Sequence, residues 1–190
     1  MAREWLEGAT DVMYTELHRS NFHEAIHELY SDLVTFGTAV MFIDTDKEQN
    51  LRFSTRHIAE CYVSEDEFGR VDTVYREFKM SAKAALDQFG EENISKQIAK
   101  KVQQDPYEHI TLLHVVMPRT ERDSLKLDAR NKPFSSCYLD PEEKIILSES
   151  GFDEFPYVVP RYLKASFEHG YGRSPAMTAL ADTKMLNKMS

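Results

Sequence analysis

The spacing of hydrophobic residues changes at residue 37, and this change constrains the fold more than any other feature of the sequence. Before it, hydrophobic residues recur every three or four positions, as on one face of an amphipathic helix. After it, residues 38–44 form a short hydrophobic run closed by charged turn residues, which is typical of a buried strand. The chain therefore combines helices with strands.

Two helices are expected before the change. Ser20 and Asn21 break the first helical pattern and offer a capping oxygen to the second helix, which ends near Phe36 and Gly37, where glycine can supply a left-handed cap. The short connection favours antiparallel neighbours whose hydrophobic stripes share a core. These stripes are Trp5, Leu6, Ala9, Val12, Met13 and Leu17, then Phe22, Ile26, Leu29, Tyr30 and Leu33.

Strand and helix patterns alternate along the rest of the chain. Helices are expected at residues 82–89, capped by Ser81, at 94–102, capped by Asn93 or Ser95, and at 174–189, capped by Ser174. Strands are expected at residues 51–54, 57–63, 71–80, 107–117, 134–139, 144–148 and 157–165. This order favours an antiparallel meander.

The predicted fold class is therefore α+β, with an N-terminal helical hairpin and further helices packed on antiparallel strands. A length of 190 residues predicts a single domain, 1–190. Within it, 1–37 is helical, 38–80 strand-rich, 81–105 helical, 106–165 strand-rich, and 174–190 the start of a long helix.

Composition excludes several classes of protein. The chain has 11 Phe and 9 Tyr, too many for a disordered protein. No hydrophobic run approaches the roughly 18 residues of a membrane span, and no secretory signal is visible, so no membrane partner is expected. Cys61 and Cys137 lack any zinc-binding spacing, which favours reduced thiols in a cytosolic chain.

Acidic residues are concentrated in the first half of the chain. The net charge is −9, and residues 1–105 hold 12 Lys and Arg against 20 Asp and Glu, whereas residues 106–190 hold 11 against 12. Nucleic-acid binders gain affinity from cations that neutralise phosphates. The acidic half therefore argues against a conventional nucleic-acid-binding module.

The sharpest local motif is HEAIH at residues 23–27. In zinc peptidases this spacing places two imidazoles, here His23 and His27, one helical turn apart on one metal, with Glu24 polarising the bound water. Here a charged residue, Glu28, follows the second histidine, and all four residues lie off the hydrophobic stripe. A solvated helix face is the favoured interpretation, and no metal or other cofactor is expected.

Other enzymatic signatures are absent from the sequence: it contains no GxGxxG, Walker or GxSxG motif. The segment 118–133 is polar and basic, and it reads as a long loop or a hairpin tip. Its cations are the candidate contacts with another subunit or with DNA, with a solvated loop as the equal alternative. They are Arg119, Arg122, Lys126, Arg130 and Lys132.

The order of several short motifs resembles that of the head-to-tail connector, or portal, proteins of short-tailed bacteriophages. The motifs are Trp5-Leu6-Glu7, Ser20-Asn21-Phe22, Tyr30-Ser31-Asp32-Leu33, Phe36-Gly37-Thr38-Ala39-Val40, Pro118-Arg119, Lys132-Pro133-Phe134, Glu149-Ser150-Gly151-Phe152, Tyr171-Gly172-Arg173-Ser174-Pro175-Ala176 and Leu186-Asn187. The resemblance covers essentially the whole chain. It carries no catalytic residue and places HEAIH in an ordinary structural helix.

The resemblance implies a structural role. Portals form dodecameric rings at one capsid vertex, contact terminase, capsid, scaffold and tail adaptor proteins, and pass double-stranded DNA without sequence specificity. The chain would then be a wing-like part of a longer subunit, in the virion and, during assembly, in the host cytoplasm. Two alternatives remain: a zinc-dependent hydrolase that uses HEAIH, and a stand-alone tail adaptor.

Overall fold

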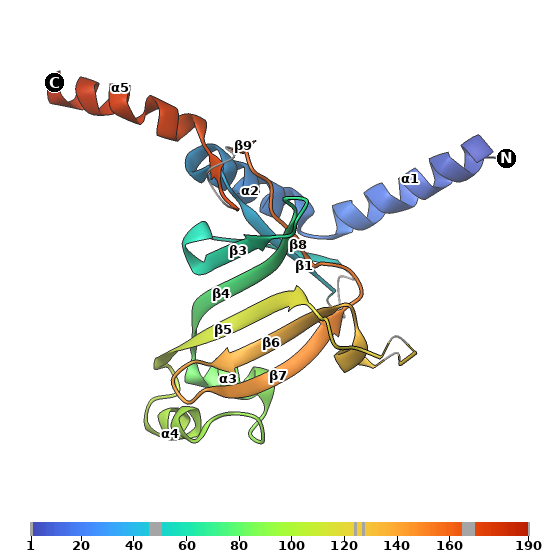
Figure 1. Cartoon of the computed structure of the whole chain (residues 1–190), viewed down its shortest axis with the longest axis vertical. Coiled ribbons are helices and arrows are strands. Elements are labelled where there is room, and N and C mark those ends of the chain that lie inside the picture. Colours follow the sequence, from blue (N-terminus) through green and yellow to red (C-terminus); the bar gives the residue numbers. More distant parts are fainter. Residues whose placement is uncertain (1, 46–50, 124, 127, 165–169, 190) are drawn as a thin grey trace. The chain divides into compact units, whose positions relative to one another are not determined.

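The computed structural model describes residues 2–45, 51–123, 125–126, 128–164 and 170–189. Its helices are α1 (Ala2–Arg19), α2 (Phe22–Phe36), α3 (Ala82–Phe89), α4 (Lys96–Gln104) and α5 (Pro175–Met189), with 3-10 turns at Ile58–Glu60 and Ala129–Asn131. Its strands are β1 (Val40–Asp44), β2 (Arg52–Arg56), β3 (Cys61–Glu65), β4 (Val71–Ser81), β5 (His109–Pro118), β6 (Phe134–Asp140), β7 (Ile145–Phe152), β8 (Tyr157–Val158), β9 (Leu163–Lys164) and β10 (Gly172–Arg173). All described strand pairs are antiparallel, so the predicted α+β class is confirmed (Figure 1).

The chain forms two compact units. Unit 1 contains Met1–Ile58 and Pro156–Ser190, and unit 2 contains Ala59–Phe155. Unit 1 is thus built from both ends of the chain, whereas unit 2 is one continuous segment. That the two units act as one domain stays a prediction.

Unit 1 is built around α2 and the three-stranded sheet β2-β1-β8. Its core contains buried residues from α2, β1 and β2, among them Leu29, Met41 and Phe53. The Asn21 side chain donates to the backbone oxygen of Phe53 at 2.7 Å and accepts from its N–H at 2.9 Å. Asn21 therefore fixes the start of α2 to β2 instead of capping the helix as expected, while Ser20 Oγ accepts from the N–H of Phe22.

The expected common core of the first two helices is wrong for α1. No residue of α1 is buried, and Leu17 is the stripe residue that packs against the unit 1 core. The physical reason is that Asn21 ties the start of α2 to Phe53 of β2, and α1, which ends just before this point, points away from α2 instead of lying along it (Figure 1). The stripe of α1 consequently faces solvent, with Trp5 72% exposed.

Unit 2 is a five-stranded sheet in the order β3-β4-β5-β6-β7, with α3 and α4 on one of its faces. In β5, the alternating residues Ile110, Leu112 and Val116 are buried. Ile110 and Leu112 meet Phe89 of α3 and Ile98 of α4 in one core. Ser81 and Ser95 accept from the N–H groups of Ala84 and Ile98, which confirms the predicted caps of these helices.

Two predicted strands differ from the structure. The segment 57–63 begins with the 3-10 turn Ile58–Glu60, and β3 starts only at Cys61. The segment 157–165 splits into the two-residue strands β8 and β9, and Pro160 between them cannot donate a ladder hydrogen bond. Ala165 lies outside the described residues.

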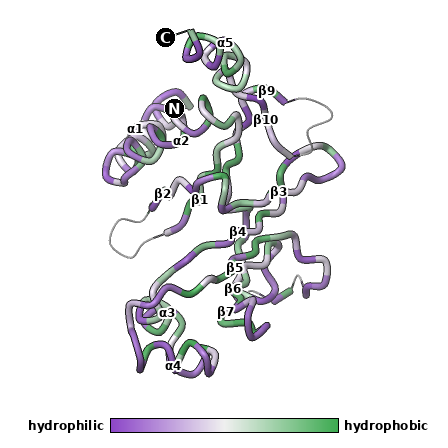
Figure 2. Tube along the Cα trace, turned by 90° about the vertical axis from the view of Figure 1, so that its left-hand side faces the viewer, coloured by the Kyte–Doolittle hydropathy of each residue, from purple (hydrophilic) through white to green (hydrophobic). Residues whose placement is uncertain are grey.

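The C-terminal helix α5 is confirmed at the predicted place, with Ser174 Oγ accepting from the N–H of Met177 at 2.9 Å. It has no buried residue, and Figure 2 shows hydrophobic residues along it in green. Within the part of the chain described here, no helix is both long and apolar enough to span a bilayer.

Candidate functional site

The HEAIH segment lies on the solvent face of α2. His23, Glu24, His27 and Glu28 are all exposed, while Ala25 on the opposite side is buried. This confirms the interpretation as a solvated face. Among the described residues, no group of three or more His, Cys, Asp or Glu side chains is arranged to hold a metal ion.

His23 is engaged with the end of α1. Its Nε2 lies 2.9 Å from Nδ1 of His18, and the two rings stack with centroids 4.9 Å apart. A metal on His23 and His27 would have to break this contact. The structure therefore pairs His23 with His18 of α1.

The basic segment is anchored by Arg119. Its guanidinium donates to the backbone oxygens of Arg130 and, at 3.2 Å, of Ser150, and its Nη2 lies 3.2 Å from Oε1 of Glu149. The Arg119 side chain is only 13% exposed. This arginine therefore fastens the connection between β5 and β6 to β7, and it offers little surface to a ligand.

The other candidate cations differ in how far they are paired. Lys132 contacts Asp153 at 2.9 Å, Arg130 lies 3.7 Å from Glu149, and Lys126 lies 3.7 Å from Asp123. Arg122 is exposed, and within the described part of the chain it has no ion pair. The structure thus brings Arg119 and Arg130 together on one carboxylate and leaves the remaining cations apart.

Three of the short motifs in unit 2 meet at this point. A side chain on Gly151 would lie 2.8 Å from the backbone oxygen of Phe134 and 2.9 Å from Cβ of Lys132, so only glycine lets these segments pack. Phe134 in turn pairs with Phe152 across β6 and β7. We call this group, with Arg119 and Glu149, the arginine cluster.

Cys137 borders the arginine cluster. It pairs with Glu149 across β6 and β7, and it lines a shallow depression with Arg119. Burial raises the pKa of the Cys137 thiol, the Glu149 charge raises it further, and the Arg119 charge lowers it. Within the described residues, Cys61 and Cys137 form no disulfide. A raised thiol pKa does not favour a nucleophilic role.

Two further motifs meet in unit 1, at the start of α5. Gly37 has φ +78° and ends α2 with a left-handed cap, as predicted. A Cβ on Gly172 would lie 2.5 Å from the backbone oxygen of Gly37, and one on Gly37 would lie 2.6 Å from the N of Ser174. The two backbones therefore cross with no room for a side chain on either glycine. We call this crossing the glycine junction.

Hydrogen bonds complete the glycine junction. Thr38 Oγ1 accepts from the N–H of Gly172 at 2.7 Å, and Ser174 Oγ donates to the backbone oxygen of Thr35 at 2.8 Å. The N–H of Tyr162 donates to the backbone oxygen of Gly37 at 2.9 Å. Thr38 and Ser174 are both buried. The first residue before α5 is thus held against the last turn of α2.

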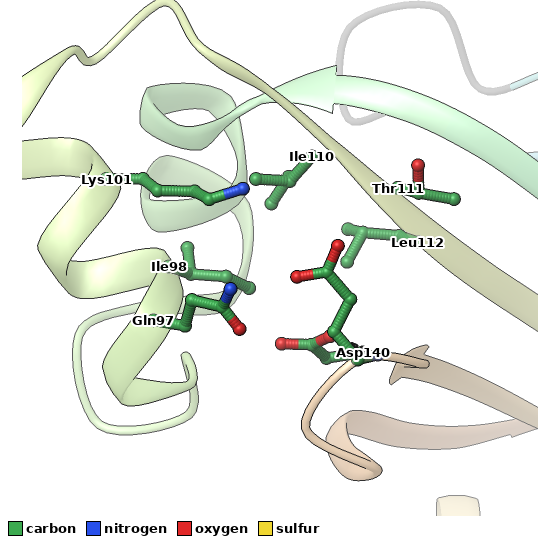
Figure 3. A pocket seen from close by; sticks show the side chains of 8 residues that line it. Gln97, Ile98, Lys101, Ile110, Thr111, Leu112 and Asp140 are labelled. Atoms are coloured by element: carbon green, nitrogen blue, oxygen red, sulfur yellow. Dashed lines mark hydrogen bonds between the residues drawn. The ribbon is translucent and has the colours of Figure 1, made fainter.

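The cavity shown in Figure 3 is too small for a substrate. Its volume is about 10 Å³, the space of roughly one water molecule. It lies between α4, β5 and the end of β6, and Gln97, Lys101 and Asp140 point toward it (Figure 3). Asp140 Oδ1 accepts the N–H groups of Glu142 and Glu143, which makes it a turn-forming residue.

Lys101 at the rim of this cavity is held by Glu108 at 3.1 Å. The hydrogen bond from Lys101 to Glu108 raises the pKa of the lysine, burial lowers it, and the charges of Glu108, Glu142 and Asp140 raise it. This ion pair joins α4 to the beginning of β5. Its arrangement is structural.

Sequence reasoning missed the acidic partners of the basic segment. Glu149 and Asp153 lie in β7 and just after it, and nothing local in the sequence pairs them with Arg119 or Lys132. The available signal was the strand register: once β6 and β7 are paired, Glu149 stands opposite Cys137 beside the end of β5. That pairing depends on the fold.

Comparison with known proteins gives one consistent result. Residues 1–190 match the family described as bacteriophage head to tail connecting protein. The chain is 33% identical over 186 residues to the portal protein of Salmonella phage epsilon15, which covers 96% of this chain and 33% of that protein. It is 32% identical over 187 residues to the probable portal protein of Bordetella phage BPP-1, which covers 97% of this chain and 34% of that protein. The chain thus spans about a third of the length of these relatives.

Proposed function

The chain belongs to the family of bacteriophage head to tail connecting proteins, and from this premise we propose that it is a structural part of a portal. In this proposal copies of the subunit form a dodecameric ring at one capsid vertex. DNA is packaged and ejected through the ring. The role is structural and not catalytic. The subunit resides in the virion and, during assembly, in the host cytoplasm.

The observation that carries the proposal is the match over all 190 residues, together with the spatial grouping of the motifs that resemble the family. Motifs that are more than 100 residues apart in sequence meet at the glycine junction, since Thr38 Oγ1 accepts a hydrogen bond from the N–H of Gly172 across 134 positions. Other motifs meet in the arginine cluster. Because these motifs contact one another, they support the same fold, which is expected of residues that a family retains for its structure.

The proposed partners are other copies of the subunit, terminase, capsid and scaffold proteins, tail adaptors and double-stranded DNA. The charge distribution supports passage of DNA more than binding. Net charge is −9, and four of the five candidate cations have acidic neighbours in the same chain. Anionic surfaces give phosphates no favourable stopping point.

The candidate contact residues divide under this proposal. Arg122 remains a candidate for contact with DNA or a neighbouring subunit because it is exposed and has no ion pair among the described residues. Arg130 and Lys126 can also contact DNA or a neighbouring subunit through their exposed ends, because their ion pairs within the chain are long, at 3.7 Å. Arg119 and Lys132 hold the segment in place.

No observation favours the two alternatives. The hydrolase would need a metal on His23 and His27, and His23 instead contacts His18. The stand-alone adaptor is not favoured either, because both matched relatives bear the name portal protein.

The test is to localise the chain in particles of the phage or prophage that encodes it. Antibodies raised against the 190-residue chain should label one vertex per particle in electron micrographs, and disrupting the coding sequence should leave heads without DNA. Labelling of every vertex, labelling of tails alone, or normal DNA-filled heads without the protein would contradict the proposal.

A further inference from the structure

Helix α1 presents an uncovered hydrophobic face. Trp5, Val12 and Met13 are each more than 60% exposed, over an 18-residue helix in which nothing is buried. Trp5, Ala9, Val12 and Glu16 follow one another at spacings of four, three and four, so they lie on one face. Contiguous exposed hydrophobic residues of this kind mark a surface that binds another protein.

Helix α5 presents a second such face in the same unit. Met177, Leu180 and Met185 are exposed, and no residue of the helix is buried. Lys184 and Lys188 lie on this face at helical spacing, and neither has an ion pair among the described residues. The face is therefore hydrophobic with two unpaired lysines.

The two helices carry opposite net charge. Helix α1 contains four acidic residues and two arginines, and its net charge stays negative although Arg3 pairs with Glu7 and Arg19 with Glu16. Helix α5 contains two lysines and one aspartate. Two copies of α1 placed together would repel each other, as would two copies of α5, whereas α1 against α5 attracts.

We propose that the hydrophobic face of α1 docks on the hydrophobic face of α5 of a second copy of this chain. The proposal rests on the proposed function and deepens it, because it names the contact between neighbouring subunits. Trp5 and Met13 pack against Leu180 and Met185 of the partner subunit, and the acidic α1 meets the lysines of the partner's α5.

This contact joins two different patches, so it is heterologous. A heterologous contact leaves one free α1 face and one free α5 face on every pair, so further copies add, and they form a ring where the rotation between copies closes. An isologous contact, which uses the same patch on both copies, stops at a dimer. The charge pattern therefore favours ring growth over pairing.

The test uses two single substitutions, each of which places a charge on one of the two hydrophobic faces. Met13→Asp disrupts the hydrophobic face of α1 and leaves that of α5 unchanged, whereas Met185→Asp disrupts the face of α5 and leaves that of α1 unchanged. Both side chains are more than half exposed, so neither change disturbs the core. Trp5 is the only tryptophan in the chain, and its fluorescence reports burial of α1 directly.

In sedimentation velocity, we expect the unmodified chain to self-associate as its concentration rises, with a shift of Trp5 emission to shorter wavelength. Each variant alone should weaken association by about tenfold or more. Mixed together, the two variants should form a one-to-one dimer and no larger species. Leu125→Asp, at a 91% exposed residue of unit 2, is the matched control and should associate normally.

Three results would overturn the proposal: an unmodified chain that stays monomeric at every soluble concentration, a Met13→Asp or Met185→Asp variant that associates as strongly as the unmodified chain, or a mixture that fails to form the dimer. These results are independent of the particle-labelling test. A chain that associates as expected but labels no unique vertex would remove the portal role and keep the interface.

Discussion

Thr38 Oγ1 accepts a hydrogen bond of 2.7 Å from the N–H of Gly172, across 134 positions of the chain. The contact closes unit 1 by joining the segment after α2 to the segment before α5. Both groups are buried, so losing either partner would leave an unsatisfied polar group. The direction in which α5 leaves the unit is therefore set at this point.

The first prediction concerns the glycine junction. Gly172→Ala should lower the free energy of unfolding by about 1–3 kcal/mol, because the methyl group overlaps the backbone of Gly37. Gly37→Ala should lower the free energy of unfolding by about 1–2 kcal/mol more than Gly172→Ala does, because the φ of Gly37, +78°, is in the left-handed region. Urea unfolding measures both changes. Gly8→Ala is the control: it has open space in helix α1 and should stabilise by about 0.5–1 kcal/mol. Equal effects at all three sites would contradict the crossing.

The second prediction concerns the start of α5. Ser174→Ala removes the acceptor for the N–H of Met177 and the donor to the backbone oxygen of Thr35. The free energy of unfolding should fall by about 1–2 kcal/mol, and hydrogen exchange at the Met177 amide should become faster. Thr183→Ala is the control, since this hydroxyl bonds only the preceding turn of its own helix in the structure described. Unchanged exchange at Met177 would show that α5 is not anchored there.

The third prediction concerns Cys137. Because burial and the Glu149 charge raise its pKa, alkylation of Cys137 should need a higher pH than alkylation of an exposed cysteine. Glu149→Gln removes one of these causes, so the midpoint of the pH–rate profile should move to lower pH. Mass spectrometry of the labelled peptides measures the rate, with a short cysteine-containing peptide as the exposed reference. Asp153→Asn, which removes a carboxylate from Lys132 instead, should leave the profile in place. An unshifted midpoint in Glu149→Gln would contradict the assigned contact.

The fourth prediction concerns the pH dependence of the ion pair between Lys101 and Glu108. Folding raises the pKa of Lys101, so the pair contributes stability below the ordinary lysine pKa of 10.5 and loses it as the pH rises through the folded value. Lys101→Met should therefore lower the free energy of unfolding by about 1 kcal/mol at neutral pH. The difference from the unmodified chain should shrink above pH 10.5. Lys100→Met, at an exposed neighbour outside this ion pair, is the matched control.

The fifth prediction concerns the HEAIH segment. Neither zinc nor a chelator should change the unfolding midpoint, because no three-ligand group exists among the described residues. Stoichiometric zinc that disappears in both His23→Ala and His27→Ala would instead establish the metal site. Mass spectrometry of the native chain gives the zinc content.

The sequence by itself determined the local features of this protein. The change of hydrophobic spacing at residue 37 located the end of α2, and Ser81, Ser95 and Ser174 were recognisable caps. Each of these features depends on hydrogen bonds or packing between residues three or four positions apart, so the types of neighbouring residues are enough to predict it. The exposed HEAIH face follows for the same reason.

Only the tertiary structure decided which distant residues meet. The register of β6 and β7 places Glu149 beside Arg119, and chain closure places Gly172 on Gly37. It also decided that α1 leaves its hydrophobic face uncovered, although its spacing matches that of a buried helix. The spacing of hydrophobic residues predicts which side chains share a helix face. Whether other elements pack on that face depends on the direction in which the chain leaves the helix. That direction is fixed by contacts such as the one between Asn21 and Phe53, 32 residues apart.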